Sequence, residues 1–380
     1  MRNANYILIR AYYVHGVPIG RKGGAKMKKI LLAGGGTGGH IYPNIALVPA
    51  LERRGFEVYY GGEKGDSAEA VVARKEKLPF YGVTCVKLVR SLRPAAIRNN
   101  LSIPATLLKG VREARRILAE TAPDAVFSKG GFAALPFVLA AAAERIPLLC
   151  HESDSTLGLS NKIAAAKGAR VLTAYPDCGF GEFVGMPIRE ELFCKDGTVT
   201  RRALGIPSGR KVLLVVGGSS GAEFLNDAVR QLLPALTSLC TVIHVTGKGK
   251  FSDTERRDGY IPLEYSDDMG SLYAASDVVL SRAGATAVAE ISALKKRAVF
   301  VPLPKGISRG DQIPNAELAR RYGATVLAQD DKFIHKLYPV VKKAFDSAPM
   351  KRIADDANGK IAELVDDTIR RGVKCKDKKR

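Results

Sequence analysis

The sequence has little cysteine and histidine, and neither residue type is spaced to hold a metal. The six cysteines, at positions 85, 150, 178, 194, 240 and 375, form no Cys-x-x-Cys pair, and none of the five histidines partners them. A disulfide framework or a zinc site needs characteristic spacings of such residues. The pattern therefore predicts reduced thiols, a cytosolic protein and no bound metal.

Long apolar runs are also missing. The longest, at residues 132–143, has twelve residues and contains a proline, whereas a membrane-spanning helix needs about 20. Residues 1–26 hold five basic residues and no acidic one, but they have neither the apolar core nor the cleavage site of a secretory signal. We interpret this stretch as a disordered extension and Met27 as the natural start.

Acidic residues are outnumbered by basic ones. The chain has 59 Lys and Arg against 38 Asp and Glu, a formal charge of +21. Such an excess indicates an anionic partner or surface. No zinc-ligand cluster, RNP-like aromatic motif or long arginine run accompanies the charge, so we expect no nucleic acid partner. Phosphorylated ligands and an anionic membrane surface remain as candidates.

One basic segment, residues 88–118, also carries apolar residues at regular intervals. Arg112, Arg115 and Arg116, for example, follow Leu108 within a few positions. Such a stretch can lie on anionic lipid, with its apolar side in the membrane and its arginines at the phosphates. The alternative is a helix pair whose charged face is turned to water, and the sequence does not separate the two.

Glycine is abundant, and it gathers at two turns that follow apolar runs. Residues 30–43 are Ile-Leu-Leu-Ala-Gly-Gly-Gly-Thr-Gly-Gly-His-Ile-Tyr-Pro, and residues 212–221 are Val-Leu-Leu-Val-Val-Gly-Gly-Ser-Ser-Gly. Each run predicts a buried strand followed by a glycine turn and a helix. The first helix is expected from about Asn44, and the second over 223–236. Such a unit binds anions at the helix start. Two units predict an α/β fold of two doubly wound, Rossmann-like domains with a cleft between them.

Glycine and proline also mark the boundary between the halves. Gly185-Met-Pro-Ile-Arg189 is expected to be a linker. We predict, in order, the extension at 1–26, a first domain at 27–184, the linker at 185–189, a second domain at 190–350, a terminal helix within 351–372 (at 353–370) that can pack back on the first domain, and a basic tail at 373–380.

Two regions bear on the ligand. Gly34–Gly39 satisfies G-x-G-x-x-G, and Glu63 lies where a dinucleotide fold has its ribose carboxylate, which alone indicates a dehydrogenase. In the second half, residues 281–290 predict a strand end, a glycine turn and a helix with Glu290 in its first turn. That helix start can hold phosphate while Glu290 accepts ribose hydroxyls, and residues 309–316 suit sugar hydroxyls. The set indicates a nucleotide-sugar site.

These motifs, in their order and spacing, resemble those of the MurG family. The resemblance covers about residues 27–372 and is carried by Gly-Gly-Gly-Thr-Gly-Gly-His-x-x-Pro, His151-Glu152, Gly185-x-Pro-x-Arg189, Gly217-Gly-Ser-x-Gly221 and Ser281–Glu290. It implies a GT-B fold and inverting transfer of N-acetylglucosamine from UDP-N-acetylglucosamine to undecaprenyl-diphospho-MurNAc-pentapeptide (lipid I), giving lipid II in peptidoglycan synthesis. It also implies a peripheral enzyme at the cytoplasmic face of the cell membrane.

The resemblance implies roles for single residues. His40 is the implied catalytic base. The implied donor contacts are Arg189, Ser219, Asn226, Tyr265, Ser266, Thr286, Ala287, Glu290, Asp311 and Gln312. The implied acceptor contacts are Gly36, Thr37, Gly38, Gly39, Lys129, Gly130, Gly131, Phe132, His151, Glu152 and Asp154. Asp154, Ala287 and Asp311 depart from the Asn, Thr and Gln that are usual for the family.

The implied chemistry needs a base for the acceptor hydroxyl and stabilisation of the UDP leaving group, which helix N-terminal amides supply. The sequence has no Asp-x-Asp pair, so we expect neither a metal held in that way nor a cofactor. Three alternatives stay open: a related transferase with another lipid acceptor, a non-catalytic nucleotide-sugar-binding partner of a membrane complex, and the dehydrogenase. His151 and His244 can also be buried structural histidines.

Overall fold

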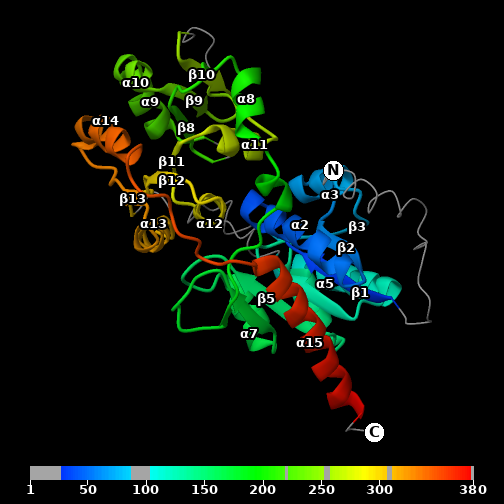
Figure 1. Cartoon of the computed structure of the whole chain (residues 1–380). Coiled ribbons are helices and arrows are strands. Elements are labelled where there is room, and N and C mark those ends of the chain that lie inside the picture. The colour runs from blue at the N-terminus through cyan, green and yellow to red at the C-terminus, as the bar shows by residue number, and fades with distance from the viewer. Residues whose placement is uncertain (1–26, 87–102, 219–220, 252–256, 306–309, 378–380) are drawn as a thin grey trace.

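The computed structural model describes residues 27–86, 103–218, 221–251, 257–305 and 310–377. Two sheets covered by helices occupy the two halves of the chain (Figure 1). The predicted extension at 1–26, the first part of the basic segment, Ser219 and the last three residues lie outside the described residues.

The N-terminal sheet has seven strands in the order β3-β2-β1-β4-β5-β6-β7. They are β1 (Lys28–Ala33), β2 (Phe56–Glu63), β3 (Phe80–Val83), β4 (Ala125–Ser128), β5 (Leu148–Glu152), β6 (Arg170–Thr173) and β7 (Glu182–Phe183). Neighbours pair in parallel; Ile30, for example, pairs with Val58 on one side and Ala125 on the other. The order reverses between β1 and β4, and such switch points are where α/β sheets bind ligands.

The C-terminal sheet has six strands in the order β10-β9-β8-β11-β12-β13. They are β8 (Val212–Val216), β9 (Thr241–Val245), β10 (Tyr260–Leu263), β11 (Val278–Ser281), β12 (Arg297–Phe300) and β13 (Thr325–Val326). All neighbouring pairs are again parallel, and the switch point lies between β8 and β11. Two doubly wound sheets confirm the fold class that the two glycine turns predicted.

The central strands form where apolar residues are continuous. Every residue of β4, β8 and β11 is buried, and so are the last four residues of β1. Parallel strands with helices on both faces carry such uninterrupted apolar runs. The glycine turns then follow at the carboxyl ends of β1, β4, β8 and β11, next to the two switch points.

Helices connect and cover the strands of both sheets. In the N-terminal half they are α2 (Gly38–Arg53), α3 (Ala68–Lys75), α5 (Ile103–Thr121), α6 (Leu135–Ala143) and α7 (Leu159–Ala166). After the linker they are the 3₁₀ helix η1 (Glu190–Phe193), α8 (Gly197–Ala203), α9 (Glu223–Gln231), α10 (Leu233–Leu239), α11 (Met269–Ala275), α12 (Ala285–Ala293), α13 (Gln312–Arg321), α14 (Phe333–Ala344) and α15 (Ala357–Asp377).

Helix α2 begins at Gly38, before the predicted start near Asn44. Thr37 is its N-cap in an extended conformation, φ −147° and ψ 155°, and threonine is favoured at that position. Asn44 is instead completely buried, and its Nδ2 donates to the Tyr60 hydroxyl at 3.4 Å. His40 therefore belongs to the helix and not to a loop before it.

Three other boundaries differ from the prediction. The helix expected over 223–236 is two helices, because Pro234 lies at the start of α10, where proline is favoured. Helix α8, which was not predicted, is capped by Asp196, whose carboxylate accepts the Thr198 amide at 2.8 Å. The terminal helix begins at Ala357 and not at residue 353.

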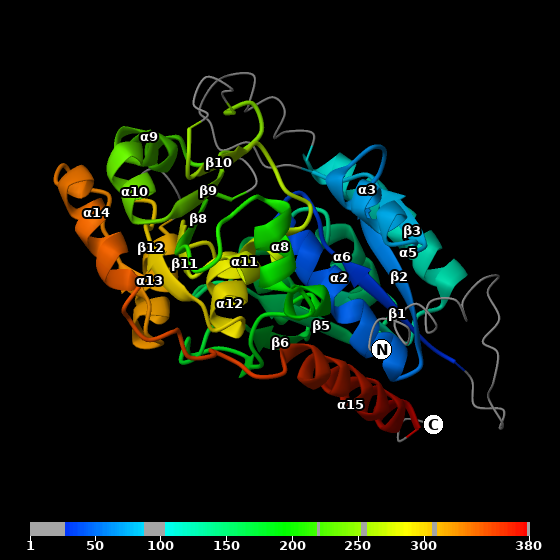
Figure 2. The same cartoon turned by 45° about the horizontal axis from the view of Figure 1, so that its top comes forward.

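Helix α15 lies against the N-terminal sheet, although it follows the second domain in the sequence (Figures 1 and 2). Ile361 and Val365 are fully buried in the core cluster that contains Ile30 and Leu51. The chain therefore crosses between the domains twice, at the linker and again just before α15.

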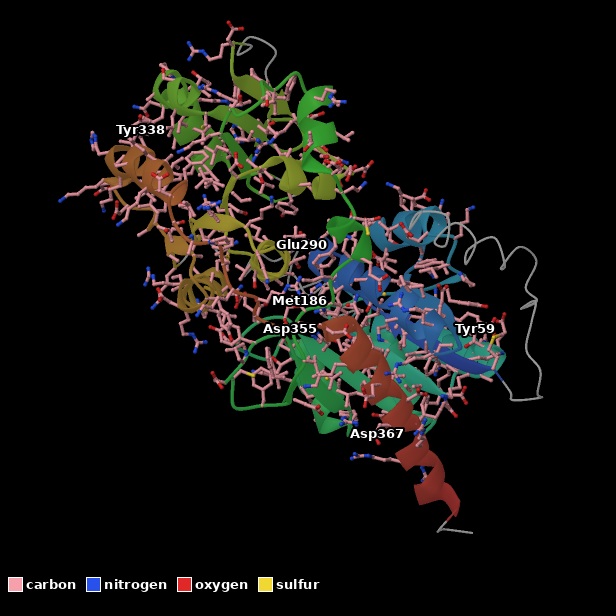
Figure 3. All side chains as sticks on the ribbon, viewed as in Figure 1. Tyr59, Met186, Glu290, Tyr338, Asp355 and Asp367 are labelled. Atoms are coloured by element: carbon pink, nitrogen blue, oxygen red, sulfur yellow. The ribbon has the colours of Figure 1, made fainter. Side chains whose placement is uncertain are left out.

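Figure 3 shows where the two crossings lie. In this view Met186 of the linker and Asp355 before α15 are drawn beside Glu290 of α12, whereas Tyr59 and Tyr338 are drawn away from the junction. The junction is lined from both sides: Ser153, Tyr175, Ala285, Val288 and Asn315 line one pocket there.

Candidate functional site

The loop after β1 turns at Gly36 and leads into α2. Gly36 has φ +82°, and a side chain there would collide with the Phe132 ring, so the position requires glycine. Thr37 occupies the N-cap position, although its side chain makes no capping hydrogen bond, and Gly38 and Gly39 begin the first turn. First-turn amides have no acceptor within their own helix and suit an anion. The loop therefore offers amide donors at the carboxyl edge of the first sheet.

His40 lies in the same first turn and is partly exposed. Its Nδ1 is 3.0 Å from Thr37 Oγ1. A Cβ placed on Gly131 would lie 3.2 Å from that nitrogen, so the loop after β4 adjoins the imidazole ring. An imidazole can exchange a proton near neutral pH. The predicted residues His40 and Gly131 are thus brought together.

A buried carboxylate that the sequence did not single out, Glu69 of α3, holds this loop. Its Oε2 accepts the Gly36 amide at 3.1 Å, and its Oε1 accepts the Glu63 amide at 3.0 Å. Because the Gly36 amide is engaged, a ligand would meet the first-turn amides of Gly38 and Gly39. Carboxylates are common in first helical turns, so nothing in the sequence distinguished Glu69.

Lys129 follows β4 and is only 1% exposed. Its Nζ donates to Ser153 Oγ. Burial lowers the pKa of Lys129 to about 8, although the negative charges of Glu152 and Asp154 act to raise it. The ammonium therefore joins the loops after β4 and β5 below the site, instead of facing an open surface as a phosphate contact would.

His151 and Glu152, predicted acceptor contacts, support the loops instead of facing the junction. His151 is fully buried, and its Nε2 is 2.9 Å from the Gly185 carbonyl oxygen. Burial lowers the pKa of His151 well below its usual value, so the ring is neutral and donates to that carbonyl. Glu152 Oε1 accepts the Ser153 amide at 2.8 Å and the Asp154 amide at 3.2 Å. Both side chains are used by the protein itself.

Asp154 reaches across the junction to the second domain. Its Oδ1 accepts from Asn315 Nδ2 of α13 at 3.2 Å, and burial raises the pKa of Asp154. The Tyr175 hydroxyl donates to the Pro314 carbonyl at 2.7 Å. Two loops of the first domain therefore hold the start of α13.

Helix α12 begins at the carboxyl edge of the second sheet and meets α2. Gly284 is its N-cap, and Thr286 and Ala287 lie in its first turn. A Cβ placed on Gly39 would lie 3.8 Å from Thr286 Oγ1. Two helix N-termini therefore converge at the junction, and their positive ends together favour a strongly anionic ligand.

Glu290 lies in the second turn of α12, and not in the first as predicted, because the helix begins at Ala285. Arg189 Nη2 is 3.9 Å from Glu290 Oε1, and the Tyr273 hydroxyl donates to Oε2 at 3.4 Å. Burial raises the pKa of Glu290, and Arg189 opposes that shift. The helix dipole does not account for a carboxylate at this position, because its effect falls off within the first turn.

Arg189 of the linker and Tyr42 of α2 bring the domains together. The Arg189 guanidinium carbon lies 4.9 Å from the centre of the Tyr42 ring. Burial and a hydrogen bond to Tyr265 raise the pKa of Tyr42 to about 12. Tyr265 is 38% exposed, with Lys248 Nζ 4.9 Å from its ring centre. Tyr42 was not selected from the sequence, because only the folded chain places it next to the second domain.

Three of the remaining predicted donor residues, Asp311, Gln312 and Ser266, lie at the start of α13 or in the loop before α11. Asp311 occupies the N-cap position of α13 without a side-chain capping hydrogen bond, and Gln312 begins the helix. Gln312 Oε1 accepts the Leu303 amide at 3.1 Å. The Ser266 hydroxyl accepts the Asp268 amide at 3.2 Å. These residues remain near the junction or at the approach to it.

Asn226, a predicted sugar contact, is 1% exposed and is used inside the second domain. Its Nδ2 donates to the Thr246 carbonyl at 2.8 Å, and its Oδ1 is 3.0 Å from His244 Nε2. His244 is completely buried, as expected of a structural histidine. Asn226 therefore supports the end of β9 and does not line the junction.

Two general features are clear over the described ranges. No three His, Cys, Asp or Glu residues gather there in a way that could hold a metal ion. No helix of the described ranges is long and apolar enough to cross a membrane.

Residues 30–173 match the N-terminal domain of glycosyltransferase family 28, and residues 212–368 match its C-terminal domain. Together with two doubly wound sheets whose switch points meet at one junction, these matches define a GT-B glycosyltransferase. The chain is 25% identical to the crystal structure of Acinetobacter baumannii MurG, with a TM-score of 0.63 over 90% of this chain and 99% of that one. The chain belongs to glycosyltransferase family 28 and, within it, to the MurG family.

Curated relatives agree. The UDP-N-acetylglucosamine–N-acetylmuramyl-(pentapeptide) pyrophosphoryl-undecaprenol N-acetylglucosamine transferase of Lachnospira eligens is 42% identical, over 84% of this chain and 91% of that protein. The enzyme of the same name from Lachnoclostridium phytofermentans is 39% identical, over 90% of this chain and 99% of that protein. A thymidine-diphosphate-bound glycosyltransferase, SsfS6, is 17% identical with a TM-score of 0.56 and shares the fold.

Proposed function

We propose that the junction between the two sheets is where this chain carries out its family's reaction. That reaction is inverting transfer of N-acetylglucosamine from UDP-N-acetylglucosamine to the MurNAc 4-hydroxyl of lipid I, which gives lipid II for peptidoglycan synthesis. One observation carries the proposal: the N-termini of α2 and α12 converge, with Gly39 close to Thr286. Donor and acceptor each bring a diphosphate, and helix N-termini are suited to bind one each.

The donor belongs on the α12 side. The amides of Thr286 and Ala287 would hold its diphosphate, and Glu290 would accept the ribose hydroxyls. In support, Thr286 and Ala287 are first-turn residues, and Glu290 is held at the junction by Tyr273. Arg189, 3.9 Å from Glu290, supplies positive charge for the phosphates.

The outer donor contacts follow from the same placement. Tyr265 and the backbone of Ser266 would flank the uracil, since the Tyr265 ring is partly exposed. Asp311 and Gln312, at the start of α13, would address the sugar. Ser219, outside the described residues, keeps its proposed diphosphate contact on sequence grounds alone. Asn226 is proposed only as a support of this side.

The acceptor belongs on the α2 side. The amides of Gly38 and Gly39 would bind the lipid diphosphate, with Thr37 at their side. Gly36, Gly130, Gly131 and Phe132 shape this cradle, while Lys129, His151 and Glu152 hold its loops. Asp154, held by Asn315, lies where the two domains join.

His40 is the proposed general base. A neutral ring whose Nδ1–H donates to Thr37 Oγ1 has its lone pair on Nε2. Nε2 would remove the proton from the 4-hydroxyl as that oxygen attacks C1 of the donor sugar. The C1–oxygen bond to UDP breaks from the opposite face, which inverts the configuration. The released charge is stabilised by the α12 amides and Arg189.

We also propose that the enzyme is peripheral to the cytoplasmic face of the cell membrane, on anionic lipid, and has no nucleic acid partner. The described part of the basic segment, α5, supports this. One side is buried at Gly110, Ala114 and Leu118, whereas Leu108, Arg112 and Arg116 are exposed. An undecaprenyl-linked acceptor also requires access to a membrane.

The test is turnover. Purified protein is mixed with labelled UDP-N-acetylglucosamine and lipid I in detergent or vesicles, and the product is examined for labelled lipid II. The same protein with a diacylglycerol acceptor tests the related lipid transferases. Tight UDP binding without lipid II formation would contradict the catalytic assignment.

A further inference from the structure

The two crossings between the domains are packed directly against each other. Gly185, the first residue of the linker, has φ +86°, and a side chain there would collide with Ala354 of the second crossing. The Gly185 carbonyl is held by His151 Nε2 at 2.9 Å. The path of the linker therefore depends on the segment that leads into α15.

Asn358, in the first turn of α15, joins the crossings by hydrogen bonds. Its Nδ2 donates to the Ile188 carbonyl at 2.8 Å and to the Ala46 carbonyl of α2 at 3.0 Å, and its Oδ1 accepts the Ile188 amide at 3.1 Å. The side chain is 8% exposed. Only a side-chain amide both donates and accepts in this way. Asn358 thus fixes both backbone groups of one linker residue against the first domain.

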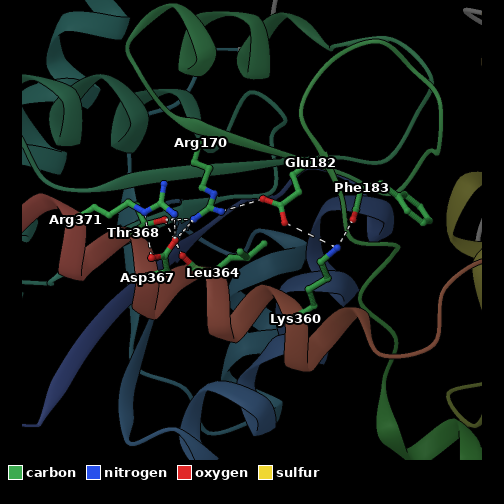
Figure 4. A network of polar contacts seen from close by, with 8 residues as sticks. All are labelled: Arg170, Glu182, Phe183, Lys360, Leu364, Asp367, Thr368 and Arg371. Carbon is green, nitrogen blue, oxygen red and sulfur yellow. Dashed lines mark hydrogen bonds and ion pairs between the residues drawn. The ribbon is translucent and has the colours of Figure 1, made fainter.

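Two residues further along α15, Lys360 holds the chain just before the linker (Figure 4). Lys360 Nζ donates to the Phe183 carbonyl at 2.7 Å and lies 3.9 Å from Glu182. Arg170 connects Glu182, at 2.9 Å, to Asp367, at 2.7 Å, further along α15. The linker is therefore held before its start and near its end by one helix.

This arrangement bears on the donor side because Arg189 directly follows Ile188. The backbone that carries Arg189 is held by Asn358, and its guanidinium lies 3.9 Å from Glu290 and over the Tyr42 ring. We infer that Asn358 is a positioning residue for donor binding: it holds the linker so that Arg189 faces Glu290 and the donor diphosphate. The inference rests on the proposed donor roles of Arg189 and Glu290.

A double-mutant cycle on UDP affinity tests this coupling. UDP binding is measured by calorimetry for the full-length protein and for Asn358→Leu, Arg189→Ala and the double variant. We expect Asn358→Leu to weaken UDP binding about tenfold in the parent protein, and by less than twofold once Arg189 is replaced. A residue that only stabilises the fold would weaken binding equally in both backgrounds, and that result would overturn the inference.

Two further variants keep the test decisive if Asn358→Leu does not fold. Asn358→Asp keeps the acceptor for the Ile188 amide but loses both donated bonds. It should therefore also weaken UDP binding when Arg189 is present, and not in the Arg189→Ala protein. Glu363→Ala removes an exposed ion pair with Arg54 from the same helix, outside the contacts that hold the linker. It should keep UDP affinity within twofold even if Tm falls.

The possible failures are distinguishable. Wild-type UDP affinity in Asn358→Leu and Asn358→Asp, with weakened binding in Arg189→Ala, would remove Asn358 and leave the donor site intact. Unchanged affinity in Arg189→Ala itself would contradict the donor-site proposal and, with it, the positioning role.

Discussion

Glu290 is a largely enclosed carboxylate, its side chain 12% exposed, with the Tyr273 hydroxyl and the Arg189 guanidinium beside it. If it accepts two ribose hydroxyls, Glu290→Ala should raise KM for UDP-N-acetylglucosamine, because hydrogen bonds to a charged group contribute roughly 1.5–3 kcal/mol. Steady-state kinetics with the donor varied at saturating lipid I measure this. Glu317→Ala, an exposed carboxylate of the same domain, is the control. Unchanged KM and kcat would remove Glu290 from the site.

The state of Glu290 also predicts a pH dependence of donor binding. Burial raises the pKa of this carboxyl, and the acceptor role requires the ionised form. UDP affinity should therefore fall with acidification, beginning above the pH at which an ordinary glutamate would be protonated. Titrations over the acid range should show this limb in the parent protein and lose it in Glu290→Gln. The same limb in both proteins would contradict the role.

His40 carries the sharpest prediction at this scale. A positioned base contributes roughly 10²–10⁴-fold to the rate, so His40→Ala should lower kcat by about that factor and leave UDP affinity unchanged. The parent enzyme should lose kcat as the pH falls and the imidazole is protonated, and the variant should lack that limb. A histidine that only holds the loop would mainly raise KM for lipid I.

Near-normal kcat in His40→Ala at saturating acceptor would rule out this base. Asp154 would then be the next residue to test, since it lies at the junction. Glu152 is less suited, because its oxygens already accept the Ser153 and Asp154 amides and the Asn161 side chain.

At the scale of elements, the glycine loop depends on α3. Glu69→Ala would remove the acceptor from two part-buried amides, those of Gly36 and Glu63, and a lost hydrogen bond costs about 0.5–1.5 kcal/mol. We expect a lower free energy of unfolding and a raised KM for lipid I, with KM for the donor unchanged. Denaturant unfolding and kinetics measure the two effects. Val71→Ala, at an exposed position of α3, is the control.

Glu69→Gln separates the two parts of this prediction. The amide keeps one acceptor oxygen, so it should recover part of both the stability and the acceptor affinity. A Glu69→Ala protein of normal stability and kinetics would show that the loop holds its conformation without α3.

Helix α5 predicts how the enzyme meets the membrane. Arg112 and Arg116 are exposed, whereas Arg115 pairs with Glu144 at 2.6 Å. The double change Arg112→Glu and Arg116→Glu should reduce binding to anionic vesicles, and binding by the parent should weaken with salt. Sedimentation with vesicles of defined composition measures this, alongside UDP affinity, which should not change.

Lys342→Glu with Lys343→Glu, an equal charge reversal on the exposed side of α14, is the control for α5. If the parent binds neutral and anionic vesicles equally, the charge of α5 is only a solvated face. That outcome would leave the catalytic proposal untouched.

For the whole molecule, two buried neutral histidines predict acid sensitivity. Burial lowers the pKa of His151 well below its usual value and that of His244 to about 3, whereas an unfolded histidine titrates near 6.5. Below about pH 6.5 the unfolded chain binds more protons, so stability is lost as pH falls, by up to about 1.4 kcal/mol per pH unit for each histidine.

Substitution isolates this effect, because the raised pKa values of Asp154 and Glu290 act in the opposite sense. The free energy of unfolding should fall less between pH 7 and pH 5 in His151→Gln and in His244→Gln than in the parent. His335→Gln, at an exposed position of α14, is the control. An equal fall in all four proteins would contradict the prediction.

The sequence by itself determined the fold class and the kind of ligand. Continuous apolar runs such as Ile30–Ala33 and Val212–Val216 define buried parallel strands, and the glycine turns after them mark the switch points. These signals are local, because a strand, a turn and a helix start lie within about a dozen residues of each other. The motif that ends at Glu290 and the polar residues at 309–316 together indicate a nucleotide-sugar site through their local patterns.

Only the tertiary structure decided which polar residues face the junction. His151 lies near the end of β5 and Asn226 near the start of α9, yet both side chains turn inward and hold backbone carbonyls. Asn358 contacts Ala46 across 312 positions of sequence, and Tyr42 of α2 contacts Arg189 of the linker. Such contacts depend on how the two domains pack and on the return of α15. Packing between distant segments leaves no periodic or local mark in the chain, so the sequence alone does not reveal it.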